Sequence, residues 1–305
     1  MNDVRCRGAR TSTAGYLAVF CITACALYPR AAAAQGNGHG NGHAYGHYKN
    51  QLTASGPSAA GSPELQISGT GIRTFGSWLD DATVMPEGAG SVTLAFSYWR
   101  TPAYRELDAP VIDGSIALTR RIQVGLSAPY YHAGEPGGPM ARGLGDLYLS
   151  TKIQLRDPSL PGRRVGFSAT PLVEILSYAP PDASRFSWAL PGSIEIRQGP
   201  VRAFGSAGYF SRGALFASGA IELALSERVW ITGSISRSHS VRKDDLSVAL
   251  GLTQSRTDLS GSAAVAVLPG MSVFGAVGRT ISRHDANSAT VSISSGVAFA
   301  FNVRD

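Results

Sequence analysis

Charged residues are scarce in this chain, and long hydrophobic runs are absent. Only 16% of the 305 residues are charged, whereas soluble globular proteins usually carry about 25%. The hydrophobic content of 44% excludes a chain that is disordered throughout, because such chains combine low hydrophobicity with high charge. The longest uncharged apolar run, residues 14–28, stops at Pro29. It is shorter than the ~20 residues of a membrane-spanning helix, which excludes an α-helical membrane protein.

Cysteine is confined to residues 1–34, which have the three parts of a secretory signal peptide. A positively charged start, an apolar core and small residues before a cut at Gln35 follow one another in Arg5–Arg10, Gly15–Ala26 and Ala32–Ala34. The cysteines are Cys6, Cys21 and Cys25. A chain cut at Gln35 would therefore lack disulfides, thiol catalysis and cysteine metal sites.

A second interpretation of the N-terminus competes for the cut site. Ile22–Cys25 resembles a bacterial lipoprotein box, in which Cys25 would be lipidated and would tether a soluble domain to a membrane. Cleavage at Gln35 would remove four arginines and one aspartate, which lowers the formal net charge from +6 to +3. The basic character belongs largely to this segment, so the charge does not predict nucleic-acid binding.

Residues 35–87 are predicted to be a largely irregular linker rich in Gly, His and Ser. His39, His43 and His47 recur at every fourth residue, and neutral imidazoles suit Zn, Cu or Ni. Glycines between them would make ordering such a site costly in entropy. We therefore expect a solvated linker, with no metal site and no cofactor, and keep the three histidines as the metal-ligating alternative.

From about Gly90 onward, hydrophobic residues alternate with small or polar ones, which is the period of a β-strand. In residues 146–156, Leu147, Leu149 and Ile153 lie on one face and Lys152 lies on the other. The same alternation predicts further strands at residues 165–175, 187–197, 215–226, 228–235 and 291–301, with weaker ones at 91–100, 110–119, 122–131, 201–210, 246–253, 258–268 and 271–281.

Two folds have this alternation, and the polar face separates them. A soluble sheet points its apolar face inward and presents Lys, Glu and Thr to water, whereas a membrane barrel points its apolar face to lipid. Here the polar face is mostly Ser, Gly and Ala, and short links alternate with longer loops, as in outer-membrane proteins. We predict an all-β fold for residues 88–305, a transmembrane antiparallel up-and-down β-barrel.

The strand count needs one correction, because the ranges above are odd in number and bacterial single-chain barrels have even numbers of strands. If residues 236–256 form one outer excursion, the strand at 246–253 drops out. If residues 66–73 are a strand, one is added. We predict about 12 strands, with 14 as the alternative.

One strand resembles a known family. Gly143, Gly145 and Asp146, followed by Lys152, resemble the "GxGD…KxxL" strand of the outer-membrane barrels associated with the meta-pathway of phenol degradation. The resemblance covers roughly residues 88–301 and implies a transporter for small, often hydrophobic or aromatic compounds. Phe301 would be the aromatic assembly signal near the C-terminus, although four residues follow it.

Charged residues in the polar phase would face the barrel lumen. They are Lys152, Arg156, Glu174, Glu195, Arg197, Arg202, Glu222 and Arg228. Such charges line a permeation path and set ion preference in pores. Alternatively, they pair across the lumen into a network that plugs it, because buried charges need partners. The sequence leaves both interpretations open.

No catalytic residue is predicted. GxSxG and HExxH are absent, and His132, His239 and His284 fall in outer loops or at strand ends. A barrel lipid hydrolase is the one enzyme class that we retain.

We predict a channel or transporter of the bacterial outer membrane for passive movement of small solutes. Its other partners would be outer-membrane lipid and the barrel-assembly machinery. The alternatives are a secreted or lipid-anchored soluble β-protein that binds a partner or surface, and a closed structural barrel without a pore.

Overall fold

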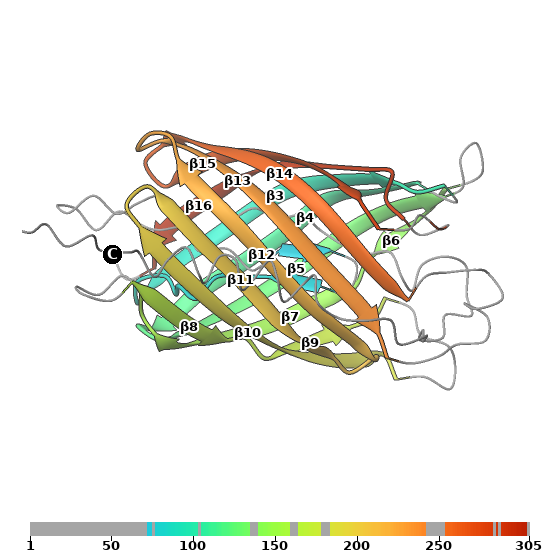
Figure 1. Cartoon of the computed structure of the whole chain (residues 1–305), viewed down its shortest axis with the longest axis horizontal. Coiled ribbons are helices and arrows are strands. Elements are labelled where there is room, and N and C mark those ends of the chain that lie inside the picture. Colours follow the sequence, from blue (N-terminus) through green and yellow to red (C-terminus); the bar gives the residue numbers. More distant parts are fainter. Residues whose placement is uncertain are drawn as a thin grey trace, which may run out of the picture. The chain divides into compact units, whose positions relative to one another are not determined.

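All regular structure in the described part of the chain is β-strand (Figure 1). The computed structural model describes residues 72–74, 77–102, 105–134, 140–158, 164–177, 184–241, 254–282, 285 and 288–303. These residues all belong to the second of two units, which spans residues 32–305. Within them, no helix has the length and hydropathy that crossing a membrane requires.

The strands of the wall follow one another along the chain and are mostly long. Their bounds are β3 (Ala89–Arg100), β4 (Arg105–Thr119), β5 (Ile122–Gly134), β6 (Met140–Leu144), β7 (Leu147–Arg156), β8 (Val165–Ala169), β9 (Leu172–Ile175), β10 (Phe186–Gln198), β11 (Val201–Phe210), β12 (Ala214–Ala224), β13 (Val229–Ser240), β14 (Ser255–Leu268), β15 (Met271–Thr280) and β16 (Val291–Asn302).

Antiparallel pairing closes these strands into a barrel. β16 pairs with β3 along its whole length, from Val291 against Arg100 to Asn302 against Ala89. β6 and β7 pair with successive parts of β5, and β8 and β9 pair with successive parts of β10, so each couple forms one interrupted strand. The result is a closed 12-strand antiparallel barrel, which confirms the predicted fold class and strand number. The weak strand predicted at 246–253 lies outside the described residues.

The wall turns its apolar face outward. Along β10, Trp188 and Leu190 are 53% and 55% exposed, whereas Ser187 and Ala189 are almost completely buried. Large exposed apolar residues continue around the barrel at Leu94, Phe96, Ile112, Leu126, Leu149, Phe167, Val173, Leu215, Ile221, Ile231, Leu259, Val277, Ile293 and Phe299. A soluble sheet would bury this face, so the interpretation of the alternation as a soluble sheet is wrong.

The two ends of the barrel differ in their connections. At one end, here called the short-turn end, two-residue turns join β4 to β5, β10 to β11 and β14 to β15. At the other, the long-loop end, residues 176–185 and 241–254 connect β9 to β10 and β13 to β14. This alternation is the one that outer-membrane barrels use for their inner and outer sides.

A piece of chain before β3 lies inside the barrel. β1 (Ile72–Thr74) and β2 (Ser77–Leu79) form a separate two-stranded sheet, and β2 contacts β11, β12 and β13 (Figure 1, cyan). Leu79, the last residue of β2, and the irregular residues 80–85 that follow it are almost completely buried. We call residues 79–85 the inner segment. The predicted linker 35–87 includes this stretch, but the sequence pattern did not place it in the lumen.

Glycine allows aromatic rings to fold against the inner wall. Phe216 of β12 lies opposite Gly208 of β11, and a Cβ at Gly208 would stand 2.9 Å from the Phe216 Cζ. The same Cβ would stand 2.5 Å from the carbonyl oxygen of Leu190. Because that oxygen belongs to the neighbouring strand, any side chain at this position displaces the backbone.

We expect Gly208→Ala to destabilise the barrel by about 1–3 kcal/mol, the usual cost of overpacking. The readout is the temperature at which the folded band of detergent-solubilised protein disappears from a semi-native gel. Gly233→Ala is the matched control, since a Cβ there has no neighbour within 4 Å. Equal melting of the two variants would contradict the close packing at Gly208.

Candidate functional site: an ion-pair cluster in the lumen

The inner segment is held to the barrel wall by one buried set of charged residues. We call it the inner cluster. It comprises Asp80 and Asp81 of the inner segment with Lys152, Glu195, Arg197, Arg202 and Glu222 of the wall.

Lys152 of β7 is directed at the inner segment. Its Nζ lies 2.7 Å from Asp80 Oδ1 and 2.9 Å from Asp81 Oδ1, and it donates to the Thr83 carbonyl at 3.2 Å. Only 3% of Lys152 is exposed. Among the described residues, the polar partners of this ammonium all lie on the inner segment.

Arg202 of β11 joins the inner segment to two further strands. Its Nη2 pairs with Asp81 Oδ2, its Nε donates to Glu195 Oε1 at 2.7 Å, and its Nη1 lies 3.5 Å from Glu222 Oε1. The guanidinium also stands 4.6 Å from the centre of the Phe204 ring, a cation–π arrangement. The planar fork of arginine can satisfy several carboxylates at once.

Glu195 of β10 uses both carboxylate oxygens and is 0% exposed. Oε1 accepts from Arg197 Nε at 2.5 Å in addition to Arg202. Oε2 accepts from the Thr83 hydroxyl at 2.8 Å and from the Ala82 amide at 3.1 Å. Arg197 in turn donates to Thr83 Oγ1 at 2.7 Å. The middle of the inner segment is therefore bound by β10 through Glu195 and Arg197, and by β11 through Arg202.

Neutral side chains of the wall satisfy the backbone of the inner segment. Gln154 Nε2 donates to the Ala82 carbonyl at 3.2 Å, the Ser168 hydroxyl donates to the Asp81 carbonyl at 3.1 Å, and the Met85 amide donates to Gln123 Oε1 at 3.1 Å. Thr170 Oγ1 donates to Asp80 Oδ2 at 3.1 Å. An irregular segment in a closed lumen needs such partners, because unpaired buried backbone groups are costly.

The cluster is nearly balanced in charge, with three cations and four carboxylates. Removing one partner of a buried ion pair typically costs 3–5 kcal/mol, because the other charge is left uncompensated. Asp81 lies on the inner segment and not on a wall strand. Burial would raise the pKa of Asp81, but the Lys152 ammonium and the Arg202 guanidinium hold it well below its ordinary value.

Five of the eight predicted lumen charges meet in the inner cluster, namely Lys152, Glu195, Arg197, Arg202 and Glu222. Their geometry favours the pairing interpretation over an open ring of charge. Glu174 also faces inward but lies nearer the long-loop end. Its Oε1 accepts from the Tyr148 hydroxyl and from Arg212 Nη2, each at 2.7 Å.

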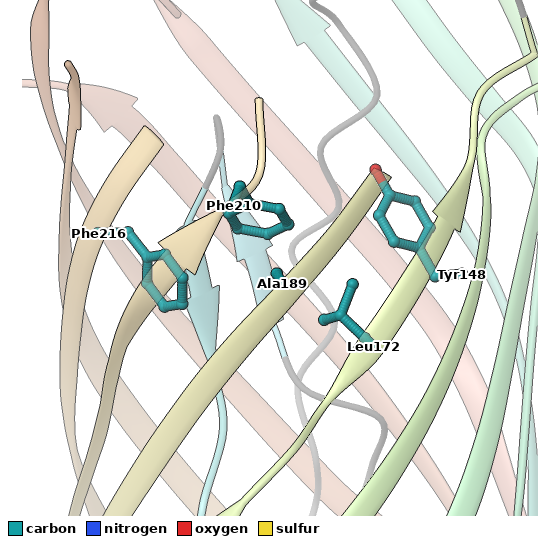
Figure 2. Packing of buried hydrophobic residues seen from close by; sticks show 5 residues of the cluster. All are labelled: Tyr148, Leu172, Ala189, Phe210 and Phe216. Carbon is teal, nitrogen blue, oxygen red and sulfur yellow. The ribbon is translucent and has the colours of Figure 1, made fainter. Parts of the chain in front are cut away.

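Tyr148 belongs to an apolar cluster in the same half of the lumen. Figure 2 shows it with Leu172, Ala189, Phe210 and Phe216, which come from β7, β9, β10, β11 and β12. The centroids of the Phe210 and Phe216 rings lie 5.4 Å apart. Toward the long-loop end the lumen therefore holds this apolar cluster beside the Glu174–Arg212 ion pair, and toward the short-turn end it holds the inner cluster.

Two predicted lumen charges lie elsewhere. The register of β7 against β8 shifts between Gln154 and Arg156, so that Arg156 is paired with the outward-facing Phe167 and is itself exposed. Arg228 is exposed in the turn between β12 and β13. Neither belongs to the inner cluster, because a strand irregularity and a turn each interrupt the alternation from which their inward direction was predicted.

The glycine and aspartate of the family-like motif have structural contacts. The Gly145 amide donates to the Pro129 carbonyl at 2.8 Å, and Asp146 Oδ1 accepts from the Ser177 amide and hydroxyl at 2.8 and 2.9 Å. Gly143 pairs with Tyr131 across β5 and β6. Of the four motif residues, Lys152 alone reaches the inner cluster.

The other sequence candidates add no second site. His39, His43, His47 and His284 lie outside the described residues, and no group of metal-ligating side chains occurs among those described. His239 Nδ1 lies 2.8 Å from Ser255 Oγ. Nucleophilic catalysis also needs a group that orients the histidine, and within the described chain no carboxylate contacts this ring.

The residues that sequence reasoning missed are Asp80, Asp81 and Thr83. They fall in the predicted linker and show no strand period. The available signal was local: two adjacent carboxylates precede a short apolar stretch, Val84–Met85, in a segment otherwise poor in charge.

No family model and no curated protein matches the sequence. Among solved structures, an outer membrane channel from Pseudomonas putida F1 matches with a TM-score of 0.57 at 13% identity, over 72% of this chain and 98% of that chain. The KdgM porin in complex with disordered oligogalacturonate has a TM-score of 0.47 at 9% identity, over 69% and 99%. The NanC porin has 0.48 at 8%, over 68% and 98%. At 13% identity, the likeness to the Pseudomonas putida channel shows a shared fold, the outer-membrane type of β-barrel.

We expect Lys152→Gln to loosen the inner segment, because the substitution leaves Asp80 and Asp81 without their shared cation. Combined with Val84→Cys, it should raise the maleimide labelling rate of the cysteine at least several-fold. Arg156→Gln, which removes an exposed charge of the same strand, is the control. Unchanged labelling in a barrel that still runs as folded would show that Lys152 does not anchor the segment.

Proposed function

We propose that this chain is an outer-membrane channel or transporter for passive movement of small solutes, and that the inner segment closes it. The observation that carries the proposal is the closed barrel whose outer face is apolar and whose lumen holds an irregular segment of the chain through ion pairs and hydrogen bonds. Outward apolar residues suit contact with lipid hydrocarbon.

In this proposal, the position of the inner segment decides whether the barrel is closed or open to solutes. Residues 79–85 lie in the lumen toward the short-turn end, and their contacts span β5, β7, β8, β10, β11 and β12. A solute can pass this level when the segment shifts. Three ion pairs, Lys152–Asp80, Lys152–Asp81 and Arg202–Asp81, join the wall to the segment. They suit a movable contact, because their partners can separate without breaking a strand.

Small, hydrophobic or aromatic solutes are the proposed cargo. The resemblance of Gly143, Gly145, Asp146 and Lys152 to the phenol-pathway barrels implies this class. The apolar cluster toward the long-loop end supports it, because this cluster places apolar and aromatic side chains on the inner side of the wall (Figure 2). We propose no enzymatic role.

The remaining parts of the chain complete the proposal. Residues 1–34 would be a signal peptide, 35–87 a linker that ends in the inner segment, and 88–305 the barrel, which the assembly machinery would insert into outer-membrane lipid. The competing functions are a closed structural barrel and a secreted or lipid-anchored protein.

We expect the full chain in the outer-membrane fraction of a Gram-negative host. Its gel mobility should differ between unboiled and boiled samples, because closed barrels resist detergent until heated. Recovery in the soluble periplasmic fraction with no such difference would contradict the membrane assignment. Labelling with a lipid precursor, with and without Cys25→Ser, separates an anchored protein from a spanning one.

We expect the double variant Asp80→Asn/Asp81→Asn to conduct several-fold better than the parental chain in planar bilayers, because neutral side chains leave Lys152 and Arg202 without their segment partners. Glu227→Gln, in an exposed turn, is the control. If the double variant labels readily at Val84→Cys and still does not conduct, the barrel is a structural one.

A further inference from the structure

We propose that Lys152, Arg202 and Thr170 form a binding site for small dicarboxylates, which the inner segment occupies with Asp80 and Asp81. The inner segment is thus an internal mimic of the ligand that displaces it, and this ligand opens the channel. This inference rests on the proposed channel function, because it assigns a ligand class to the segment that closes the channel.

The two aspartates are bound as a dicarboxylate would be. Each gives one oxygen to Lys152 Nζ, at 2.7 and 2.9 Å. The second oxygen of Asp80 accepts from Thr170 Oγ1 at 3.1 Å, and the second oxygen of Asp81 pairs with Arg202. Every one of the four carboxylate oxygens therefore faces a donor of the wall. A single compact anion offers no second carboxylate with which to contact Thr170 and Arg202 together with Lys152.

The wall is incomplete without these carboxylates. Arg202 keeps Glu195 and Glu222 when the segment leaves, and Arg197 keeps Glu195. Lys152 keeps none of its polar partners among the described residues, since they are Asp80, Asp81 and Thr83. A buried ammonium without an anionic partner is costly. A movement of the segment away from Lys152 that leaves no anion in its place is therefore disfavoured.

Exchange of the segment for a ligand avoids the cost of leaving Lys152 without an anionic partner. A small dicarboxylate that takes the positions of Asp80 and Asp81 returns an anionic partner to Lys152 and a second one to Arg202. The released aspartates become hydrated. Opening is then coupled to binding of the ligand, because a ligand shifts an equilibrium only by its difference in affinity for the two states.

The test measures exposure of the inner segment in the purified full chain in detergent micelles. Val84→Cys carries the probe, since Val84 is buried on the inner segment and takes no part in the ion pairs. We expect succinate at millimolar concentrations to raise the maleimide labelling rate several-fold and to saturate. Succinamide, which has the same carbon skeleton and no charge, and sodium chloride at matched ionic strength should have no effect. The parental chain measures background labelling.

Two wall variants decide whether the effect arises at this site. Lys152→Gln should abolish the succinate response, whereas Arg156→Gln should preserve it. Should Lys152→Gln fail to run as a folded barrel, Thr170→Val takes its place and should raise the half-maximal succinate concentration several-fold. Equal responses to succinate and succinamide, a succinate response that persists in Lys152→Gln, or an unchanged half-maximal concentration in Thr170→Val would overturn the inference. Because labelling needs no conductance, a barrel that binds succinate without conducting contradicts the channel, and one that conducts without a succinate response contradicts the site.

Discussion

Closure of the sheet through β16 and β3 is the constraint from which the rest of this structure follows. In hydrocarbon no water is available to backbone amides and carbonyls, so a spanning sheet must satisfy them within itself and can have no edge. The full-length pairing of Val291–Asn302 with Ala89–Arg100 provides that closure. Once the sheet is closed, each strand has one face toward lipid and one toward the lumen, and the side chains divide accordingly.

The narrow lumen then determines what can line it. Small residues occupy many inward positions, and larger side chains meet across the space. The aromatic rings of Phe210 and Phe216 do so (Figure 2), and so do the charged groups of the inner cluster. Glycines such as Gly208 allow rings to lie flat against the wall. In so confined a space a charge has to be paired, because desolvation of an unpaired ion costs several kcal/mol.

The buried ion pairs connect the architecture of the barrel with its proposed function. Wall residues on β7, β10 and β11 hold a segment that belongs to no strand of the barrel, through ion pairs and hydrogen bonds. Because carboxylates of the segment make these contacts, a carboxylate ligand can replace them in the mechanism that we propose.

Sequence alone determined the barrel, its strand number and the inward phase of Lys152, Glu195, Arg202 and Glu222. The alternation of side chains along a strand is a local property of the sequence. In a closed membrane sheet, this alternation decides whether a side chain points to lipid or to the lumen. The tertiary structure decided the rest. A register shift turned Arg156 outward, and Asp81 met Lys152 and Arg202 at separations of 71 and 121 residues. No local period records such contacts, because an irregular segment has no repeating face and its partners exist only after the barrel has closed around it.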